Sequence, residues 1–341
     1  MQSPKPLPAH VPLVVATRGD APESIHCGSV AVADAAGRLL WAVGDTAFPV
    51  FTRSTLKPFQ ALPFVRGGGP AHFGFSQAQI ALLCASHSGE ARHTAAVADM
   101  LARIGCAESH LQCGCHVPLY FAANGLAPPA DFVPTPLQHN CSGKHAGFLA
   151  WCRQHGQPVE NYLDPRHPLQ RAIRRTLARL ADCTVADMPS GCDGCGAPNY
   201  ALSLAQLARL YARLGAPPPA VRGRGAALAT LHAAMAACPE MVSGENRDDF
   251  ALARAAHCIA KAGAEAVQAV GVANRGLGIA VKIGDGGARA VRVVIVAVLE
   301  QLGLLADPDA AAVRAWREAE IRNQAGRVTG RLLPVFELRG R

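Results

Sequence analysis

Arg53-Ser54-Thr55-Leu56-Lys57-Pro58 places a serine and a lysine three residues apart, between a strand-like segment and a helical one. At this spacing on a helix the two side chains point into the same space. A lysine whose pKa is lowered by burial or by nearby positive charge can take the proton of a serine hydroxyl, which makes the serine a nucleophile. S-x-x-K is short and recurs by chance, so a catalytic pair here needs support from further motifs.

The segments on either side of this motif predict strands at both ends of the chain and helices in the middle. Apolar and polar residues alternate before Ser54, with a hairpin turn expected at residues 35–37, and strand-like segments return at CIAKAG, AVGVAN and GLGIAVKIGD. Helical spacing dominates between them, as in LQRAIRRTLARLAD and YALSLAQLARLYARLG. We therefore predict an α/β fold in one catalytic unit, residues 1–341, with an antiparallel sheet subdomain from 11–53 and 255–305, including a C-terminal helix, and a mostly helical subdomain over 54–254.

Composition excludes several classes of protein. Half of the 341 residues are hydrophobic and 17% are charged, which is typical of a globular chain. The start of the chain lacks a charged segment followed by an apolar run, and the apolar stretch at 293–306 is short and contains Glu300, so we expect a cytoplasmic protein without membrane insertion. The net charge of +8 comes from scattered arginines and not from a basic run, so we expect no nucleic-acid partner.

Four further segments are unusually polar or rich in glycine for their apolar surroundings. The first two are LLCASHSGEARHT, which contains Ser86, and QHNCSGKHA at residues 138–146. The others are SGCDGCGAPN at 190–199 and CIAKAG at 258–263, where Lys261 lies near the end of a strand. Such serines also cap helices, and a lysine at a strand end is usually an edge residue whose head reaches solvent.

The twelve cysteines are best explained as reduced thiols, some of which could bind a metal. Cys192 and Cys195 form one C-x-x-C pair, which can be redox-active or structural. No second C-x-x-C has the spacing of a four-cysteine zinc site.

The order of these motifs resembles that of serine β-lactamases and penicillin-binding proteins, in which S-x-x-K, a serine motif and K-x-G follow one another. The strings SHSGE, HNCSGKHAGF, DGCGAPNYAL, MVSGEN and AKAGAE resemble, more specifically, the Rhizobium-type bacterial L-asparaginases, which share that architecture. The resemblance extends from about Arg18 to Leu302. It implies a serine β-lactamase-like fold, hydrolysis of L-asparagine to L-aspartate and ammonia, and a homodimer.

The resemblance also implies two Ser-Lys pairs in one site. These are Ser54 with Lys57, and Ser86 with Lys261. Ser54 would be the nucleophile and Lys57 its base, while Ser86 and Lys261 would relay a proton to the departing ammonia. We expect the oxyanion to be bound by backbone N–H groups at Ser54 and just after Lys261.

Some members of this family bind zinc through two cysteines and a lysine, which correspond here to Cys141, Cys195 and Lys144. A lysine must be neutral to bind a metal, and deprotonating a free one at pH 7 costs about 4.6 kcal/mol. Zinc binding must offset this cost. We expect zinc as a helper that orients the substrate. The resemblance further places Asp193, Arg53 and His139 as substrate-binding or zinc-supporting residues.

The sequence departs from the family's pattern at Ala266, where glycine is usual, and around Asp249-Phe250. We expect neither departure to touch the proposed pairs. Two other functions stay open at this stage. One is a glutaminase or another serine acylase on the same scaffold, and the other is a non-catalytic zinc-binding sensor in which the serines only cap helices.

Overall fold

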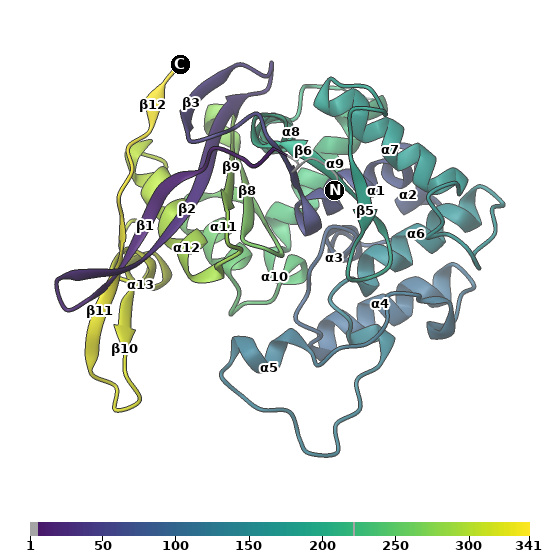
Figure 1. Cartoon of the computed structure of the whole chain (residues 1–341). Coiled ribbons are helices and arrows are strands. Elements are labelled where there is room, and N and C mark those ends of the chain that lie inside the picture. Colours follow the sequence, from purple (N-terminus) through teal and green to yellow (C-terminus); the bar gives the residue numbers. More distant parts are fainter. Residues whose placement is uncertain (1–5, 221) are drawn as a thin grey trace, which may run out of the picture.

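The computed structural model describes residues 6–220 and 222–341, together with all side chains in them except that of Asn274. The large sheet and the helices near the C-terminus lie on one side of the molecule, and most of the other helices lie on the other side (Figure 1). The predicted α/β architecture is confirmed, because a large antiparallel sheet is assembled from both chain ends around a helical middle.

The large sheet has the strand order β10-β11-β1-β2-β9-β8-β7, and β3 pairs with both β2 and β12. The expected turn at residues 35–37 is confirmed, because β2 and β3 pair on either side of it. The strands are β1 (Val11–Arg18), β2 (Ala21–Asp34), β3 (Leu39–Val43), β7 (Cys258–Gly263), β8 (Val267–Val272), β9 (Leu277–Ile283), β10 (Glu320–Arg322), β11 (Val328–Pro334) and β12 (Arg339–Gly340).

This sheet extends beyond the predicted boundary at residue 305. In the register between β1 and β11, Val14 pairs with Pro334. Strand β11 therefore occupies the edge of β1 that is not paired with β2. Sequence periodicity missed these strands because β11 is half-exposed and short of apolar residues.

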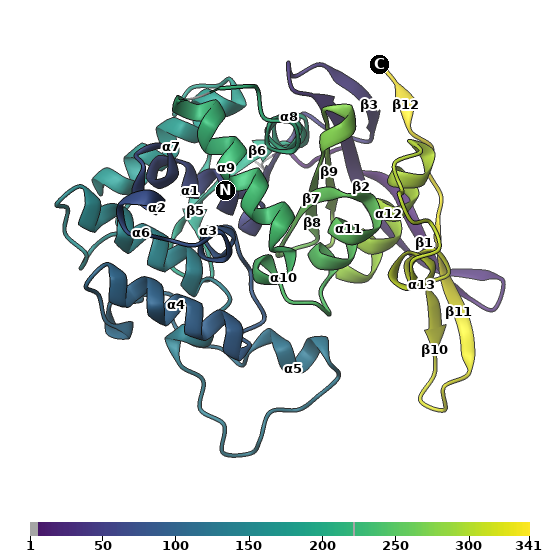
Figure 2. The same ribbon diagram turned by 180° about the vertical axis from the view of Figure 1, so that it is seen from behind.

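Two helices cover the two faces of the sheet, as the views in Figures 1 and 2 show. Valines and isoleucines such as Val30, Val32 and Ile279 face α12 (Ala288–Gln301) in one core. Small residues face α8 (Leu204–Gly215) on the other side. A Cβ at Gly278 would lie 1.8 Å from the carbonyl oxygen of Ala208, so the missing side chain of this glycine lets α8 approach the sheet backbone.

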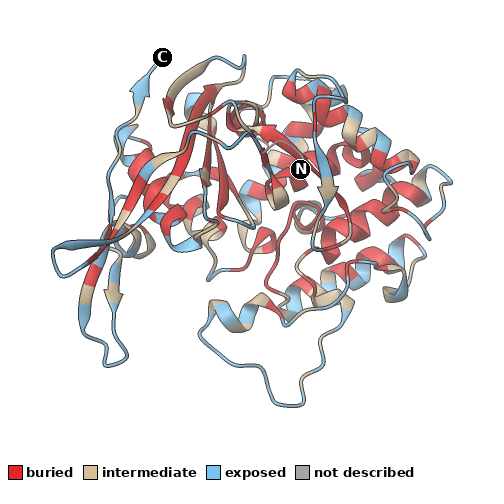
Figure 3. Ribbon diagram, in the orientation of Figure 1, coloured by how far each residue is buried: buried red, intermediate tan, exposed pale blue. Residues whose placement is uncertain are grey.

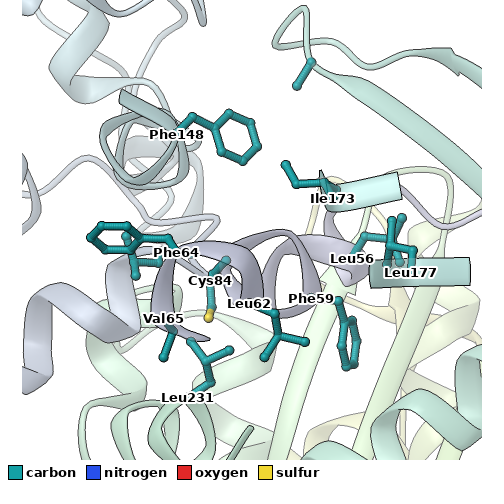
Figure 4. Close-up of a cluster of buried hydrophobic side chains, with 14 of the residues drawn as sticks. Leu56, Phe59, Leu62, Phe64, Val65, Cys84, Phe148, Ile173, Leu177 and Leu231 are labelled. Carbon is teal, nitrogen blue, oxygen red and sulfur yellow. The ribbon is translucent and has the colours of Figure 1, made fainter. Parts of the chain in front are cut away.

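The helical subdomain is built around α1 (Lys57–Arg66), the helix that follows the S-x-x-K serine. Its residues are buried along almost its whole length (Figure 3), and Phe59, Leu62 and Phe64 contact surrounding helices (Figure 4). The other helices are α2 (Gly69–His72), α3 (Gln77–Leu82), α4 (Ala91–Arg103), α5 (Leu119–Ala123), α6 (Ser142–Gln154), α7 (Pro168–Ala181), α9 (Gly223–Ala237), α10 (Pro239–Val242), α11 (Asp248–Ala256) and α13 (Ala311–Arg317), with 3-10 turns η1 (Arg53–Leu56), η2 (Glu108–His110), η3 (Pro136–Gln138) and η4 (Ala273–Arg275).

One expected helix begins later than predicted. Residues 198–203 form β6 (Pro198–Ser203), which lies between β4 (Pro49–Phe51) and β5 (Ser190–Cys192) in a small second sheet. Helix α8 begins only at Leu204, after Ser203 caps it by accepting a hydrogen bond from the backbone of Gln206. Because β6 is buried on both faces, its apolar run has no strand periodicity and reads as part of the helix.

Three of the scattered arginines, Arg171, Arg175 and Arg179, are exposed on α7. Arg174 instead bonds the carbonyl oxygen of Val185. In the part of the chain that is described, none of the helices has the length and apolar character needed to cross a membrane.

Candidate active site

The turn that carries Ser54 joins the two subdomains. It follows β4 and opens α1 through η1, which confirms the predicted junction between strand and helix. Arg53 has a φ of 50°, in the left-handed region that side chains other than glycine rarely adopt. Asn199 holds this conformation, because its Oδ1 accepts from the Arg53 N–H at 3.1 Å and its Nδ2 donates to the Arg53 carbonyl at 3.2 Å.

Asn199 was not identified from the sequence as a site residue. It is a buried polar residue inside the apolar strand β6, and this contrast was the available signal. The side-chain amide of Asn199 therefore fixes the turn at Arg53, and with it the position of Ser54.

Lys57 is buried, whereas Ser54 is partly exposed. The Lys57 Nζ donates to the carbonyl oxygen of Ala85 at 2.6 Å and to Ser86 Oγ at 2.8 Å. Burial lowers the pKa of Lys57, the Cys141 thiol opposes this shift, and the positive charges of Lys144 and Lys261 lower the pKa further. The sequence motifs of Ser54 and Ser86 thus meet at one lysine.

Lys261 has a different partner. Its Nζ lies 2.7 Å from Asp249 Oδ2 and 2.9 Å from the carbonyl oxygen of Ala262. Burial acts to raise the pKa of Asp249, but the charge and hydrogen bond of Lys261 lower it overall, so the two form a buried ion pair. Within the described residues, Ser86 hydrogen-bonds Lys57, and no such bond joins Ser86 to Lys261 or Ser54 to Lys57.

The expectation that Asp249 leaves the proposed pairs untouched is wrong. This carboxylate bonds Lys261 and also accepts from the Ala262 N–H at 2.6 Å. The backbone amide directly after Lys261 is therefore not free to bind an oxyanion. Sequence gave no local signal for this, because Asp249 belongs to α11 and meets β7 only in the folded chain.

The polar motif loops are bonded to one another behind these side chains. The backbone N–H of Ser86 donates to Val242 at 2.9 Å, and that of His87 donates to Asn140 at 3.2 Å. His87 Nε2 lies 2.9 Å from Ser142 Oγ, and burial keeps the pKa of His87 well below its ordinary value. The SHSGE, HNCSGKH and MVSGEN segments are thus joined by hydrogen bonds into one network.

Two cysteines and a lysine converge next to Lys57. Lys144 Nζ lies 2.9 Å from Cys195 Sγ, and Cys141 is buried beside them. The neighbouring Cys141 thiol lowers the pKa of Cys195, burial opposes this shift, and the charge of Lys144 lowers the pKa further. For Lys144, burial acts to lower the pKa but the charge of Cys195 raises it overall. Each of the two groups therefore favours the charged form of the other.

These three donors fit a zinc ion. Two sulfur ligands and one nitrogen ligand are typical of zinc, and the adjacent His145 has a buried Nε2 without a hydrogen-bond partner among the described residues. The described parts of the chain contain no cluster of three or more histidine, cysteine, aspartate or glutamate side chains suited to a metal, so the fit depends on Lys144. All twelve cysteines are free thiols.

The remaining predicted residues surround this centre. Asp193 Oδ1 lies 3.0 Å from Arg53 Nε, and Asn199 Nδ2 lies 3.3 Å from Asp193 Oδ2, so the two expected substrate-binding residues are paired with each other. His139 is buried against His116, and burial followed by the His116 charge lowers its pKa to about 3. A cavity of about 470 Å³ opens beside Arg53 and Asn199, with residues of both sheets in its wall.

The comparison with protein families finds one match. The model described as L-asparaginase II matches residues 14–334, nearly the whole chain. No match was found among curated proteins.

Several solved structures are similar over most of the chain. Mglu in its native form is 16% identical over 83% of this chain and 66% of that one, with a TM-score of 0.38. A β-lactamase from Mycobacterium bovis is 16% identical over 80% of this chain and 94% of that one, with a TM-score of 0.40. Mglu in its tris and glutamate form is 15% identical over 81% and 59%, with a TM-score of 0.38.

The chain thus spans two thirds or less of the length of the Mglu chains. These structural likenesses are distant and carry no argument about the site. The family match covers every motif described above, from before Arg53 to beyond Lys261. The chain belongs to the L-asparaginase II family, and this membership supports asparaginase-type amidohydrolase activity.

Proposed function

We propose that this enzyme hydrolyses L-asparagine to L-aspartate and ammonia through an acyl-enzyme on Ser54. The observation that carries the proposal is the fully buried Lys57, which lies one helical turn after Ser54 and hydrogen-bonds Ser86 at 2.8 Å. Family membership supplies the class of reaction.

Lys57 is suited to act as the base. A neutral amine has two N–H donors and one lone pair. The carbonyl oxygen of Ala85 and the Ser86 hydroxyl accept both donors, so the lone pair is left for the Ser54 proton. Burial and two neighbouring cations favour the neutral form at rest.

The reaction then proceeds in two halves. Ser54 Oγ bonds to the side-chain carbonyl carbon of asparagine while its proton passes to Lys57. The C–N bond breaks as that proton reaches the amide nitrogen through Ser86, and ammonia leaves. Water then attacks the ester carbon and gives one proton to Lys57. The bond from the acyl carbon to Ser54 Oγ breaks, Lys57 returns the proton to Ser54 Oγ, and aspartate is released.

The positions of other residues support parts of this scheme. The Ser54 N–H is our proposed oxyanion donor, since the Ala262 N–H is taken by Asp249. We propose Arg53, Asp193 and His139 as substrate-orienting residues, of which Arg53 lines the cavity. Arg53 and Asp193 would exchange their mutual bond for the carboxylate and ammonium of the substrate. Lys261 supplies positive charge beside Lys57.

Cys141, Lys144 and Cys195 would hold zinc. When bound, zinc would act as a Lewis acid that orients the substrate. Lys144 Nζ and Cys195 Sγ already lie within 2.9 Å of each other, which supports their joint role in this site. The homodimer and the cytoplasmic location stay predictions.

The test is ammonia release from L-asparagine and L-glutamine by the wild type and by Ser54→Ala, with and without added zinc. We expect the wild type to release ammonia from asparagine and Ser54→Ala to lose at least about 10⁴-fold in kcat. A preference for glutamine would assign the glutaminase alternative. Zinc binding without amide hydrolysis by the wild type would favour the sensor alternative.

A further inference from the structure

Asp249 lies in the first turn of α11, in a position that no motif marks. It is buried and accepts hydrogen bonds from three donors. These are Lys261 Nζ at 2.7 Å, the Ala262 N–H at 2.6 Å and Gln268 Nε2 at 3.3 Å. All three donors belong to β7 and β8, so one carboxylate ties helix α11 to the edge of the large sheet.

The hydrogen bond between Asp249 and Ala262 lies at an edge of the large sheet. Strand β7 is an edge strand, which pairs with β8 on one side. The backbone groups on the other side of such a strand lack a strand partner. Asp249 takes that place at the residue directly after Lys261, and so it fixes both the strand and the lysine side chain.

The same strand lies against the turn that carries the nucleophile. A Cβ at Gly263 would lie 3.0 Å from the carbonyl oxygen of Thr52 and 3.4 Å from the backbone nitrogen of Ser54. With so little space between them, a shift of β7 changes the surroundings of Ser54 directly. Asp249 itself is buried, and its two carboxylate oxygens are taken by Lys261, Ala262 and Gln268, so it acts through these groups.

We infer that Asp249 is a positioning residue of this enzyme, which holds Lys261 as a fixed cation and holds β7 against the turn of Ser54. The inference rests on the proposed function, because it concerns the same reaction. It assigns Lys261 a static electrostatic role and leaves the movement of protons to Lys57 and Ser86. Removing either partner of this buried ion pair would leave an unpaired charge in the interior.

A double-mutant cycle tests this inference with Asp249→Asn, Lys261→Met and the double variant in the full-length chain. The asparagine side chain keeps an oxygen for the Ala262 N–H but has no charge for Lys261. We expect kcat for ammonia release to fall about 100-fold in Asp249→Asn with KM unchanged. The double variant should be no less active than Lys261→Met alone, because Asp249 acts through Lys261.

The melting temperatures of the same variants give a readout apart from activity. We expect each single variant to melt lower than the wild type and the double variant to recover part of the loss, because it buries no unpaired charge. If Asp249→Asn does not fold, Asp249→Glu decides: it keeps the charge but displaces it by one methylene group, and we expect a folded protein with reduced kcat.

Asp248→Asn is the matched control. Asp248 is the preceding residue in the same turn, and it bonds Arg292 at 2.8 Å on the surface. We expect this variant to keep wild-type kcat and melting temperature. Equal losses in Asp248→Asn, wild-type kcat in Asp249→Asn or Asp249→Glu, or additive losses in the cycle would each overturn the inference. Equal activity of the wild type and Ser54→Ala would instead overturn the proposed function.

Discussion

Two lysines are buried in the same site, and their surroundings differ in one respect. Lys57 is bonded to neutral groups, the carbonyl oxygen of Ala85 and the hydroxyl of Ser86. Lys261 is bonded to the carboxylate of Asp249. Burial without a carboxylate favours the neutral amine, whereas burial with one favours the ammonium. The partner of each lysine, more than its depth in the protein, therefore decides which one can accept a proton.

The comparison predicts opposite consequences when each lysine is replaced by methionine, which has a similar length and no charge. Lys57→Met should lower kcat for ammonia release by about 10⁴-fold, the upper range for loss of a general base. Its free energy of unfolding should change by no more than about 1–2 kcal/mol, because neutral hydrogen bonds alone are lost. Steady-state kinetics and urea unfolding measure the two effects. Wild-type kcat in this variant would remove Lys57 as the base.

Lys261→Met should lower the free energy of unfolding more than Lys57→Met does. It leaves the Asp249 carboxylate buried without its cation, which costs about 3–5 kcal/mol. Urea unfolding of this variant beside Lys57→Met measures the contrast directly. If both variants lose the same free energy of unfolding, the two lysines are equivalent and the comparison fails.

A third buried lysine sharpens the comparison, because Lys144 is paired with the sulfur of Cys195. Zinc at 100 times its Kd should raise the free energy of unfolding of the wild type by about 2.7 kcal/mol. Cys195→Ser should lose this effect. Cys192→Ser, which alters the exposed cysteine of the same C-x-x-C pair, should keep it. Thermal unfolding with and without zinc, together with metal analysis, distinguishes these outcomes.

The smallest expected effect is a pH dependence of stability that comes from Lys57. Its pKa in the folded protein lies below the ordinary value of 10.5, so between these two values the unfolded chain binds more protons than the folded one. The wild type should therefore gain stability relative to Lys57→Met as pH rises through this window, by at most about 1.4 kcal/mol per pH unit, and level off above 10.5. Urea unfolding of both proteins across this range measures the difference. A difference that falls with pH would contradict the lowered pKa.

Much of the fold was predictable because its elements carry periodicity of their own. The strand that carries Lys261 was predicted over the residues that β7 occupies, and the expected C-terminal helix is α12. Strand β8 begins at Val267, two residues before the predicted segment AVGVAN. β6 and the strands after residue 305 were not predictable in this way. The first is buried on both faces, and the others depend on pairing with distant segments.

The site shows the same division between local and distant information. The resemblance to the asparaginase family placed Ser54, Lys57, Ser86 and Lys261 in one region, and the structure brings their segments together. Which serine bonds which lysine could not be read from order along the chain. The pairing depends on Asp249, which lies 12 residues before Lys261 in another element and binds the Lys261 ammonium group in place of a serine.

The pairing of β1 with β11 has a consequence for how the protein is made. β1 leaves the ribosome first, but its outer neighbour is synthesised roughly 300 residues later. At usual rates of translation this interval lasts about 15–60 s. During it the apolar strand β1 has an open edge, while the helical middle of the chain can already fold. Nascent chains that end before residue 328 should therefore depend on chaperones to avoid aggregation, and the full-length chain should be released from them once β11 has been added.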